Sequence, residues 1–147
     1  MTESNEELQR WAALSDEEWV ALQVPRFVAI RPRYLTYADF MRAVLRQGCE
    51  KPAPLAIIEA RAKGIASFAE KILRKRQSYM HRKGTLPVDP LARMTDLCGA
   101  RVIAQTSDQV QAVCRFIEEA FDVDWPNRPL KMSLLPSFAN KNMMSPS

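Results

Sequence analysis

Residues 55–80 read LAIIEARAKGIASFAEKILRKRQSYM, and the spacing of the apolar side chains changes at Gly64. Before this glycine the charged residues Glu59, Arg61 and Lys63 alternate with small or apolar ones, which is the period of a β-strand. The other face of that strand carries Ile58, Ala60 and Ala62. After the glycine, apolar residues recur every three or four positions, which predicts a helix over 65–80. The stretch therefore predicts a strand that runs directly into a helix.

Both predicted elements present cations. At 100° per residue, one side of the helix gathers a hydroxyl–cation group whose members lie within about 40° of Ser67, namely Ser67, Lys71, Arg74 and Ser78. The opposite stripe is apolar and is expected to be buried; it consists of Ile65, Phe68, Ile72 and Tyr79. A further strand is predicted over 97–104, where a nearly continuous apolar run is typical of a strand buried on both faces.

Polar residues mark the ends of this second strand. Asp96 lies where it begins, and Arg101 interrupts its apolar run. Thr106 and Gln109 have the spacing of a capping box, which predicts a helix over 107–120. The residues that follow, 121–125, alternate as a short strand would.

The first fifty residues are predicted to be helical. Ser15 and Glu18 match a capping box, and Pro25 and Pro32 are expected to break the chain. A second helix is then predicted from Thr36 to a stop at Gly48. Its apolar stripe, expected to pack inside, comprises Tyr37, Phe40, Met41, Val44 and Leu45.

The predicted organisation is an N-terminal helical segment (1–50), an α+β region (51–125) and an irregular or disordered tail (126–147). Cysteines at positions 49, 98 and 114 have no metal-ligand spacing, and Cys49 is expected to be a loop thiol. The lone His81 excludes a site built from two imidazoles. We expect a cytoplasmic protein without membrane contact, because no signal peptide and no apolar run of about 20 residues is present.

The cations have two interpretations. A net charge of +4 is compatible with an ordinary solvated helix face, and a lone Asp before a strand is often a turn residue. Alternatively, Arg61, Lys63, Ser67 and Lys71 form a cradle for a triphosphate, near the positive end of a helix. Asp96 would then hold Mg²⁺ against the phosphates. No P-loop is present, and the chain has only four glycines.

The pattern Arg61-x-Lys63-x-x-x-Ser67-x-x-x-Lys71, followed by Thr95-Asp96-Leu97-x-x-x-Arg101-Val102-Ile103, resembles the synthetase domain of the RelA/SpoT alarmone synthetases. The resemblance covers about residues 55–125, the front portion of such a domain. It implies a nucleotidyltransferase-like mixed sheet flanked by helices. It also implies Mg²⁺-dependent transfer of pyrophosphate from ATP to the 3′-hydroxyl of GDP or GTP, which makes (p)ppGpp.

The resemblance also assigns roles to single residues. Arg61 and Lys63 would be catalytic contacts to nucleotide phosphates, and Asp96 would be a catalytic Mg²⁺ ligand. Phosphate-binding residues would further include Ser67 and Lys71, with Arg74 beside them. Arg101 would support the site.

Later motifs of the family are missing from these 147 residues. No Tyr follows Tyr79, no His follows His81, and no Asp or Glu follows Asp124, so a base-stacking tyrosine and a second metal carboxylate are absent. The chain is therefore expected to be an incomplete domain, from a truncated or frameshifted gene or a naturally short homologue. Alternatives are a non-catalytic basic module that binds RNA or the ribosome, and a subunit that docks an open sheet edge on another chain. A homo-oligomer is a further expectation.

We predict that residues 1–147 make little or no (p)ppGpp from ATP and GDP with Mg²⁺. Losing a metal carboxylate and the stacking platform removes several kcal/mol of transition-state stabilisation, a rate loss of at least ~10³. Thin-layer separation of labelled products measures this directly, and robust product formation would contradict it.

Overall fold

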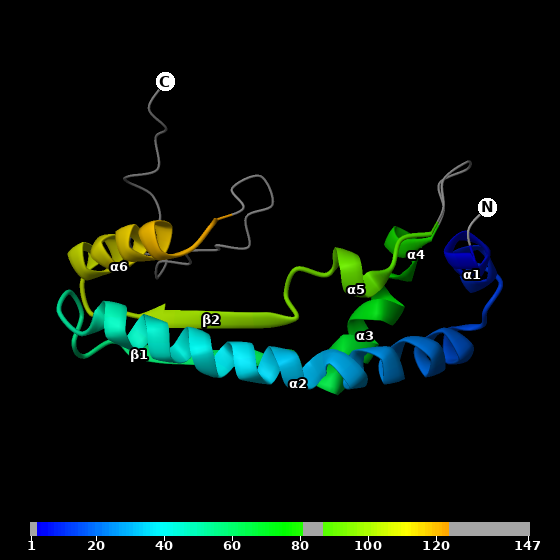
Figure 1. Ribbon diagram of the computed structural model, residues 1–147, viewed down its shortest axis with the longest axis horizontal. Coiled ribbons are helices and arrows are strands. Elements are labelled where there is room, and N and C mark those ends of the chain that lie inside the picture. Colours follow the sequence, from blue (N-terminus) through cyan, green and yellow to red (C-terminus); the bar gives the residue numbers. More distant parts are fainter. Residues whose placement is uncertain (1–2, 81–86, 124–147) are drawn as a thin grey trace, which may run out of the picture.

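The computed structural model describes residues 3–80 and 87–123. These residues form six helices and one two-stranded sheet (Figure 1). In chain order the elements are α1 (Glu3–Trp11), α2 (Asp16–Cys49), β1 (Ile57–Ala62), α3 (Ile65–Arg74), α4 (Arg76–Tyr79), α5 (Pro90–Arg93), β2 (Cys98–Ile103) and α6 (Ser107–Ala120). The predictions for His81, for 124–125 and for the tail 126–147 lie outside the described residues.

Helix α2 begins where the sequence predicts. Ser15 is its N-cap: the Ser15 Oγ accepts from the Glu18 backbone N–H at 3.1 Å, and Glu18 accepts from the Ser15 N–H at 2.8 Å. The predicted break at Pro25 and Pro32 is wrong, because α2 continues through both prolines to Cys49. The end of the helix lies one residue beyond the predicted stop.

The two prolines are tolerated because of the side on which they lie. A proline inside a helix removes one N–H and leaves the carbonyl four residues earlier without its partner. Pro25 and Pro32 are seven residues apart and both exposed, and so are Ala21 and Val28, which carry the two carbonyls. Those carbonyls can bond water, so the helix survives. The buried side of α2 keeps its hydrogen bonds and holds Phe27, among other residues.

The apolar stripe predicted for the second half of α2 is confirmed at Leu45, which is buried, but it is wrong at Tyr37 and Phe40. Tyr37 and Phe40 are 47% and 58% exposed, and their rings stack on each other at 6.4 Å. The buried residues of this half are Ala38, Leu45 and Cys49. Cys49 is therefore a buried helix residue and not a loop thiol.

Strands β1 and β2 pair in antiparallel fashion, with Ile57 opposite Ile103 and Ala62 opposite Cys98. The predicted alternation of β1 is confirmed, since Ala60 and Ala62 are buried while the charged residues between them face outward. The fold is thus of the α+β kind. The described residues contain only this antiparallel pair, so they do not show the mixed sheet that the resemblance implies.

Strand β2 is not buried on both faces, contrary to the prediction. Only one face of the sheet is covered: Ile58 and Val102 lie opposite each other and pack with Cys49 and Val113, from α2 and α6. On the other face Ile103 is 45% exposed. No third layer covers that face among the residues that the structure describes.

The helix predicted over 65–80 is divided at Lys75 into α3 and α4. Its buried stripe is confirmed at Phe68, Ile72 and Tyr79, which are at most 4% exposed. Ile65 is instead 41% exposed. It lies in the first turn of α3, before the helix reaches the core.

Helix α6 begins at the predicted place. The Thr106 Oγ accepts from the Gln109 N–H at 3.2 Å, and the Gln109 side chain accepts from the Gln105 N–H at 3.0 Å. The strand predicted after α6 is wrong over 121–123, which form no strand.

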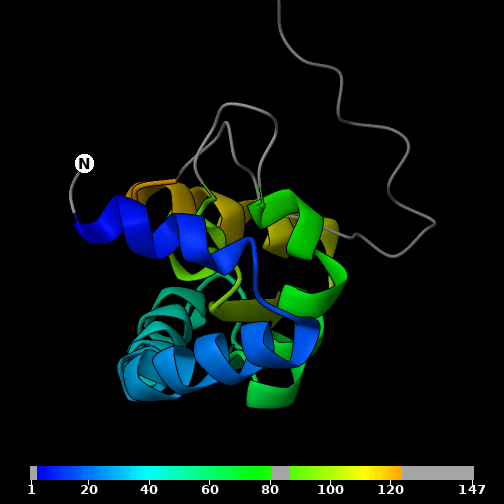
Figure 2. The same cartoon turned by 90° about the vertical axis from the view of Figure 1, so that its right-hand side faces the viewer.

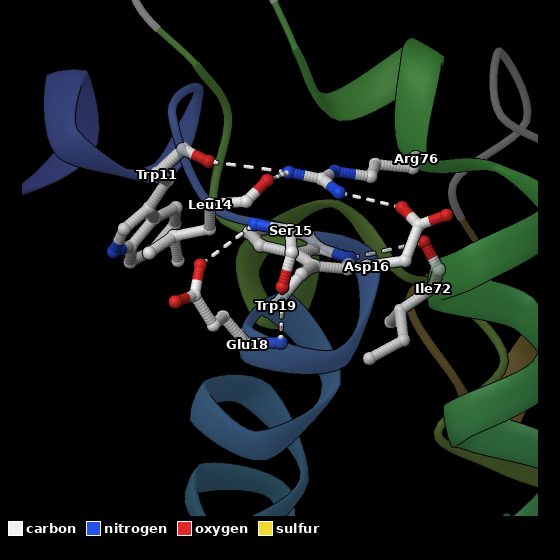
Figure 3. A network of polar contacts seen from close by, with 8 residues as sticks. All are labelled: Trp11, Leu14, Ser15, Asp16, Glu18, Trp19, Ile72 and Arg76. Atoms are coloured by element: carbon white, nitrogen blue, oxygen red, sulfur yellow. Dashed lines mark hydrogen bonds and ion pairs between the residues drawn. The ribbon is translucent and has the colours of Figure 1, made fainter.

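One core lies where α1, α3 and the start of α2 meet (Figures 1 and 2). The rings of Phe27 and Phe68 stack at 4.3 Å, and Trp19 donates from Nε1 to the Ile72 carbonyl at 3.1 Å. Arg76 closes this end: it lies 5.5 Å from the Trp19 ring, pairs with Asp16 and donates to the carbonyls of Trp11 and Leu14 (Figure 3). This network ties α4 to the loop between α1 and α2.

A second core lies at the other end of α2. There Gly48 gives the Phe116 ring of α6 room to lie against the helix, since a Cβ on Gly48 would overlap that ring. Gly48 is thus a packing residue inside α2 and not the helix stop that the sequence suggested.

We predict that Gly48→Ala destabilises the protein by about 1–3 kcal/mol, because overpacking outweighs the helix propensity that alanine normally adds. Chemical denaturation measures the change. Gly99→Ala is the matched control: a Cβ there meets nothing within 4 Å, so stability should stay the same or rise slightly. Equal effects of the two substitutions would contradict the packing role of Gly48.

Asp89 connects α5 to α2. Its carboxylate forms a two-pronged pair with Arg26, at 3.1 and 2.7 Å, and caps α5 by accepting from the Leu91 N–H at 2.9 Å. Burial raises the pKa of Asp89, but the hydrogen bonds from Arg26 and Leu91 outweigh it, so the pKa lies below its usual value.

A carboxyl whose pKa is lowered by folding stabilises the protein above its unfolded pKa of about 3.9 and loses that contribution as the pH falls through the folded value. We therefore predict that Asp89→Asn costs about 1 kcal/mol at pH 7, because asparagine keeps the cap but loses the ion pair. The difference from wild type should shrink below pH 4 in urea titrations. A constant difference down to pH 2 would argue against the pair.

Candidate functional site

One carboxylate lies between two ammonium groups at the junction of β1, α3 and β2. Asp96 Oδ2 is 2.9 Å from Lys63 Nζ, and Asp96 Oδ1 is 2.8 Å from Lys71 Nζ. The three residues come from different segments, and each oxygen of the carboxylate accepts from a different lysine. We call these three residues the Lys–Asp–Lys cluster.

Backbone contacts fix where Lys63 lies. Its N–H donates to the Leu97 carbonyl at 2.8 Å, which continues the pairing of β1 and β2 by one residue. Its carbonyl accepts from Arg31 Nε of α2 at 3.0 Å. No pattern in the sequence predicts the role of Arg31, which lies 32 positions earlier and in no motif.

The other two members of the cluster are anchored by buried neighbours. Lys71 precedes Ile72, whose side chain is fully buried against α2, so the helix cannot rotate Lys71 away. Asp96 stands between Met94 and Leu97, which are 7% and 4% exposed in the same core. The backbone at Asp96 is therefore held although the residue lies outside regular structure.

The cluster is partly shielded from water, and its three side chains are exposed to different degrees. The Lys63 and Lys71 side chains are 12% and 23% exposed, whereas Asp96 is 45% exposed. Burial raises the pKa of Asp96, but the hydrogen bonds from Lys71 and Lys63 lower it by more, so the pKa lies below its usual value. Asp96 is ionised at neutral pH, and the cluster carries one net positive charge.

Tyr79 adjoins this cluster from inside the core. Burial raises the pKa of its phenol, the charge of Lys71 lowers it and that of Asp96 raises it. The predicted burial of Tyr79 is confirmed, but nothing in the sequence pattern predicts that it lies near these charges. The phenol is protonated at neutral pH and adds no charge beside the cluster.

Arg61 and Ser67, two further members of the predicted cradle, are exposed. Arg61 lies on the outer face of the sheet, opposite Gly99, and no described residue bonds to it. Ser67 lies in the first turn of α3, where the N-cap Gly64 offers no side-chain hydrogen bond. Both side chains are open to solvent, and neither bonds to a member of the cluster.

The two remaining predicted residues have other partners. Arg74 lies 3.8 Å from Glu70 on α3, and Arg101 lies 3.8 Å from Glu59 across the sheet. All four side chains are at least 60% exposed, so these pairs are weak. Neither arginine pairs with Asp96.

The donor set does not suit a metal ion by itself. Within 3–80 and 87–123 no group of three or more His, Cys, Asp or Glu side chains could hold one. Asp96 is a single carboxylate whose two oxygens already accept from lysines. Mg²⁺ commonly uses one or two carboxylates together with substrate phosphates. Asp96 therefore fits Mg²⁺ only when a nucleotide brings further oxygen ligands.

Comparisons with known proteins give no match: no protein-family model, no curated protein and no solved structure corresponds to this chain. The alarmone synthetase resemblance thus stays a prediction from the residues. Of the helices that the structure describes, none combines the length and the apolar character that crossing a membrane requires.

Proposed function

We propose that the Lys–Asp–Lys cluster binds the phosphates of a nucleotide, and that this region is the front portion of an alarmone synthetase-like domain with a nucleotidyltransferase-like fold. In that role ATP would be the pyrophosphate donor and GDP or GTP the acceptor. The observation that carries the proposal is the convergence of Lys63, Lys71 and Asp96 from three segments of the chain.

This convergence supports the proposal for two reasons. Sequence spacing alone named these three residues for phosphate and metal contacts, although Asp96 lies 33 positions after Lys63 and 25 positions after Lys71. Two partly buried ammonium groups within 3 Å of one anion also form a setting in which a phosphate is well bound. A random solvated helix face would not bring Lys63 and Lys71 together.

The exposed residues around the cluster extend it. Arg61 lies on β1, two residues before Lys63, and Ser67 lies on the first turn of α3, the helix that carries Lys71. The uncapped start of α3 adds free N–H groups and the positive end of its dipole. A triphosphate bound at Lys63 and Lys71 could thus extend to these groups, with Asp96 as the residue that would hold Mg²⁺ beside it.

Binding of RNA receives less support from the basic run that begins at Lys71. Within its described part, Lys71 pairs with Asp96, and the Arg76 side chain is only 13% exposed against Asp16. Arg74 and Lys75 are the exposed cations there. The run therefore contributes fewer free charges to a polyanion than its sequence suggests.

We predict that ATP binding depends on the two lysines of the cluster. Lys63→Met and Lys71→Met keep the apolar stems but remove one charge each, so each should weaken binding by about tenfold, or about 1.4 kcal/mol. Isothermal titration calorimetry with ATP and Mg²⁺ measures the affinities. Lys75→Met is the matched control, because Lys75 is exposed and its side chain contacts no described partner.

The control also separates the alternatives. If all three substitutions weaken ATP binding equally, the site is a diffuse cationic surface and the proposal fails. If wild type binds RNA with steep salt dependence and ATP does not compete, the RNA-binding module is favoured instead. Thermal unfolding of each variant checks that the fold is retained.

A further inference from the structure

We infer that Asp96 is a built-in counter-anion that occupies the phosphate position between Lys63 and Lys71 when no nucleotide is bound. This inference rests on the proposed function and concerns the regulation of the same site. It goes beyond a role as metal ligand, because it predicts that Asp96 competes with phosphate wherever metal is absent.

The geometry of the cluster supports this competition. A carboxylate with each oxygen 2.8–2.9 Å from a different ammonium nitrogen makes the contacts that two phosphate oxygens would make. The two lysines are thereby neutralised in part, and the cluster keeps one net positive charge. A phosphate that binds beside an ionised Asp96 meets a like charge in a partly buried setting, where repulsion is weakly screened.

Exposure indicates the side from which a ligand arrives. Asp96 is 45% exposed, whereas Lys63 and Lys71 are 12% and 23% exposed. The carboxylate thus belongs to the most exposed side chain of the cluster. Because both ammonium groups already donate to this carboxylate, an incoming phosphate competes with it for them.

The surrounding structure permits this displacement without rearranging the core. Met94 and Leu97 hold the backbone on either side of Asp96 in the core, and the two lysines extend from the residue after β1 and from α3. Rotation of the Asp96 side chain alone would free both ammonium groups. When Asp96 pairs with a divalent cation instead, the lysines become available to phosphate, which would make tight binding depend on metal.

The test is the affinity of the full chain for ATP in metal-free buffer with EDTA, and for inorganic pyrophosphate as a second probe. Asp96→Asn keeps the size of the side chain and removes its charge. We expect it to tighten metal-free binding by about tenfold relative to wild type, which corresponds to about 1.4 kcal/mol. With Mg²⁺ present, wild type should bind ATP more tightly than without it, whereas Asp96→Asn should gain little.

Asp39→Asn is the matched control, since it removes the same charge from an exposed pair with Arg42 on α2. If both substitutions tighten binding equally, net charge explains the effect and the inference fails. If Asp96→Asn weakens metal-free binding, Asp96 supports the site and does not compete. If neither wild type nor Asp96→Asn binds ATP, the proposed function itself fails.

A measurement on the unaltered chain covers the case in which Asp96→Asn does not fold. In carbon-13 NMR, the Asp96 carboxyl signal of wild type should shift toward that of a solvated carboxylate as pyrophosphate is added without metal. The Lys63→Met chain should show a much smaller shift. An Asp96 signal that stays constant while pyrophosphate binds would overturn the inference.

Discussion

Helix α2 positions every element that carries a residue of the candidate site. It contacts β1, β2, α3 and α6, and it is long enough to join two separate cores. Its continuity depends on one constraint: both prolines must face water, so that the carbonyls they leave unpaired can bond solvent. If Pro25 or Pro32 lay on the buried side, the unpaired carbonyl would be costly and the helix would divide.

Two arginines of α2 link this helix to the backbone next to the Lys–Asp–Lys cluster. Arg31 donates to the Lys63 carbonyl, and Arg42 donates to the Ala60 carbonyl of the same strand. These bonds join the helix to one carbonyl within β1 and one directly after it, so β1 cannot slide along α2 without breaking them. Because the charged groups bond backbone atoms, the register of β1 and hence the place of Lys63 are fixed.

Local patterns predicted the parts of the fold that depend on local physics. The alternation that ends at Lys63, the buried stripe containing Phe68 and the caps at Ser15 and Thr106 all follow from chain geometry over a few residues, and all are present. The failures concern burial, which other elements decide. The apolar pattern predicts burial for Tyr37 and for both faces of β2. However, the sequence does not show which faces of a helix or sheet pack against another element.

In the site, too, local patterns predicted some features, while contacts between elements decided others. Spacing selected Lys63, Lys71 and Asp96 as chemically related, but it grouped Arg61 and Ser67 with them equally. Which members meet depends on side-chain reach from fixed backbones: Lys63 and Lys71 both reach Asp96, while Arg61 lies on the uncovered face of the sheet. A carboxylate that neutralises two cations also changes what the cations do, since they then bind an external anion only in competition with it. The chemistry of the cluster therefore follows from the pairing and not from the count of its basic residues.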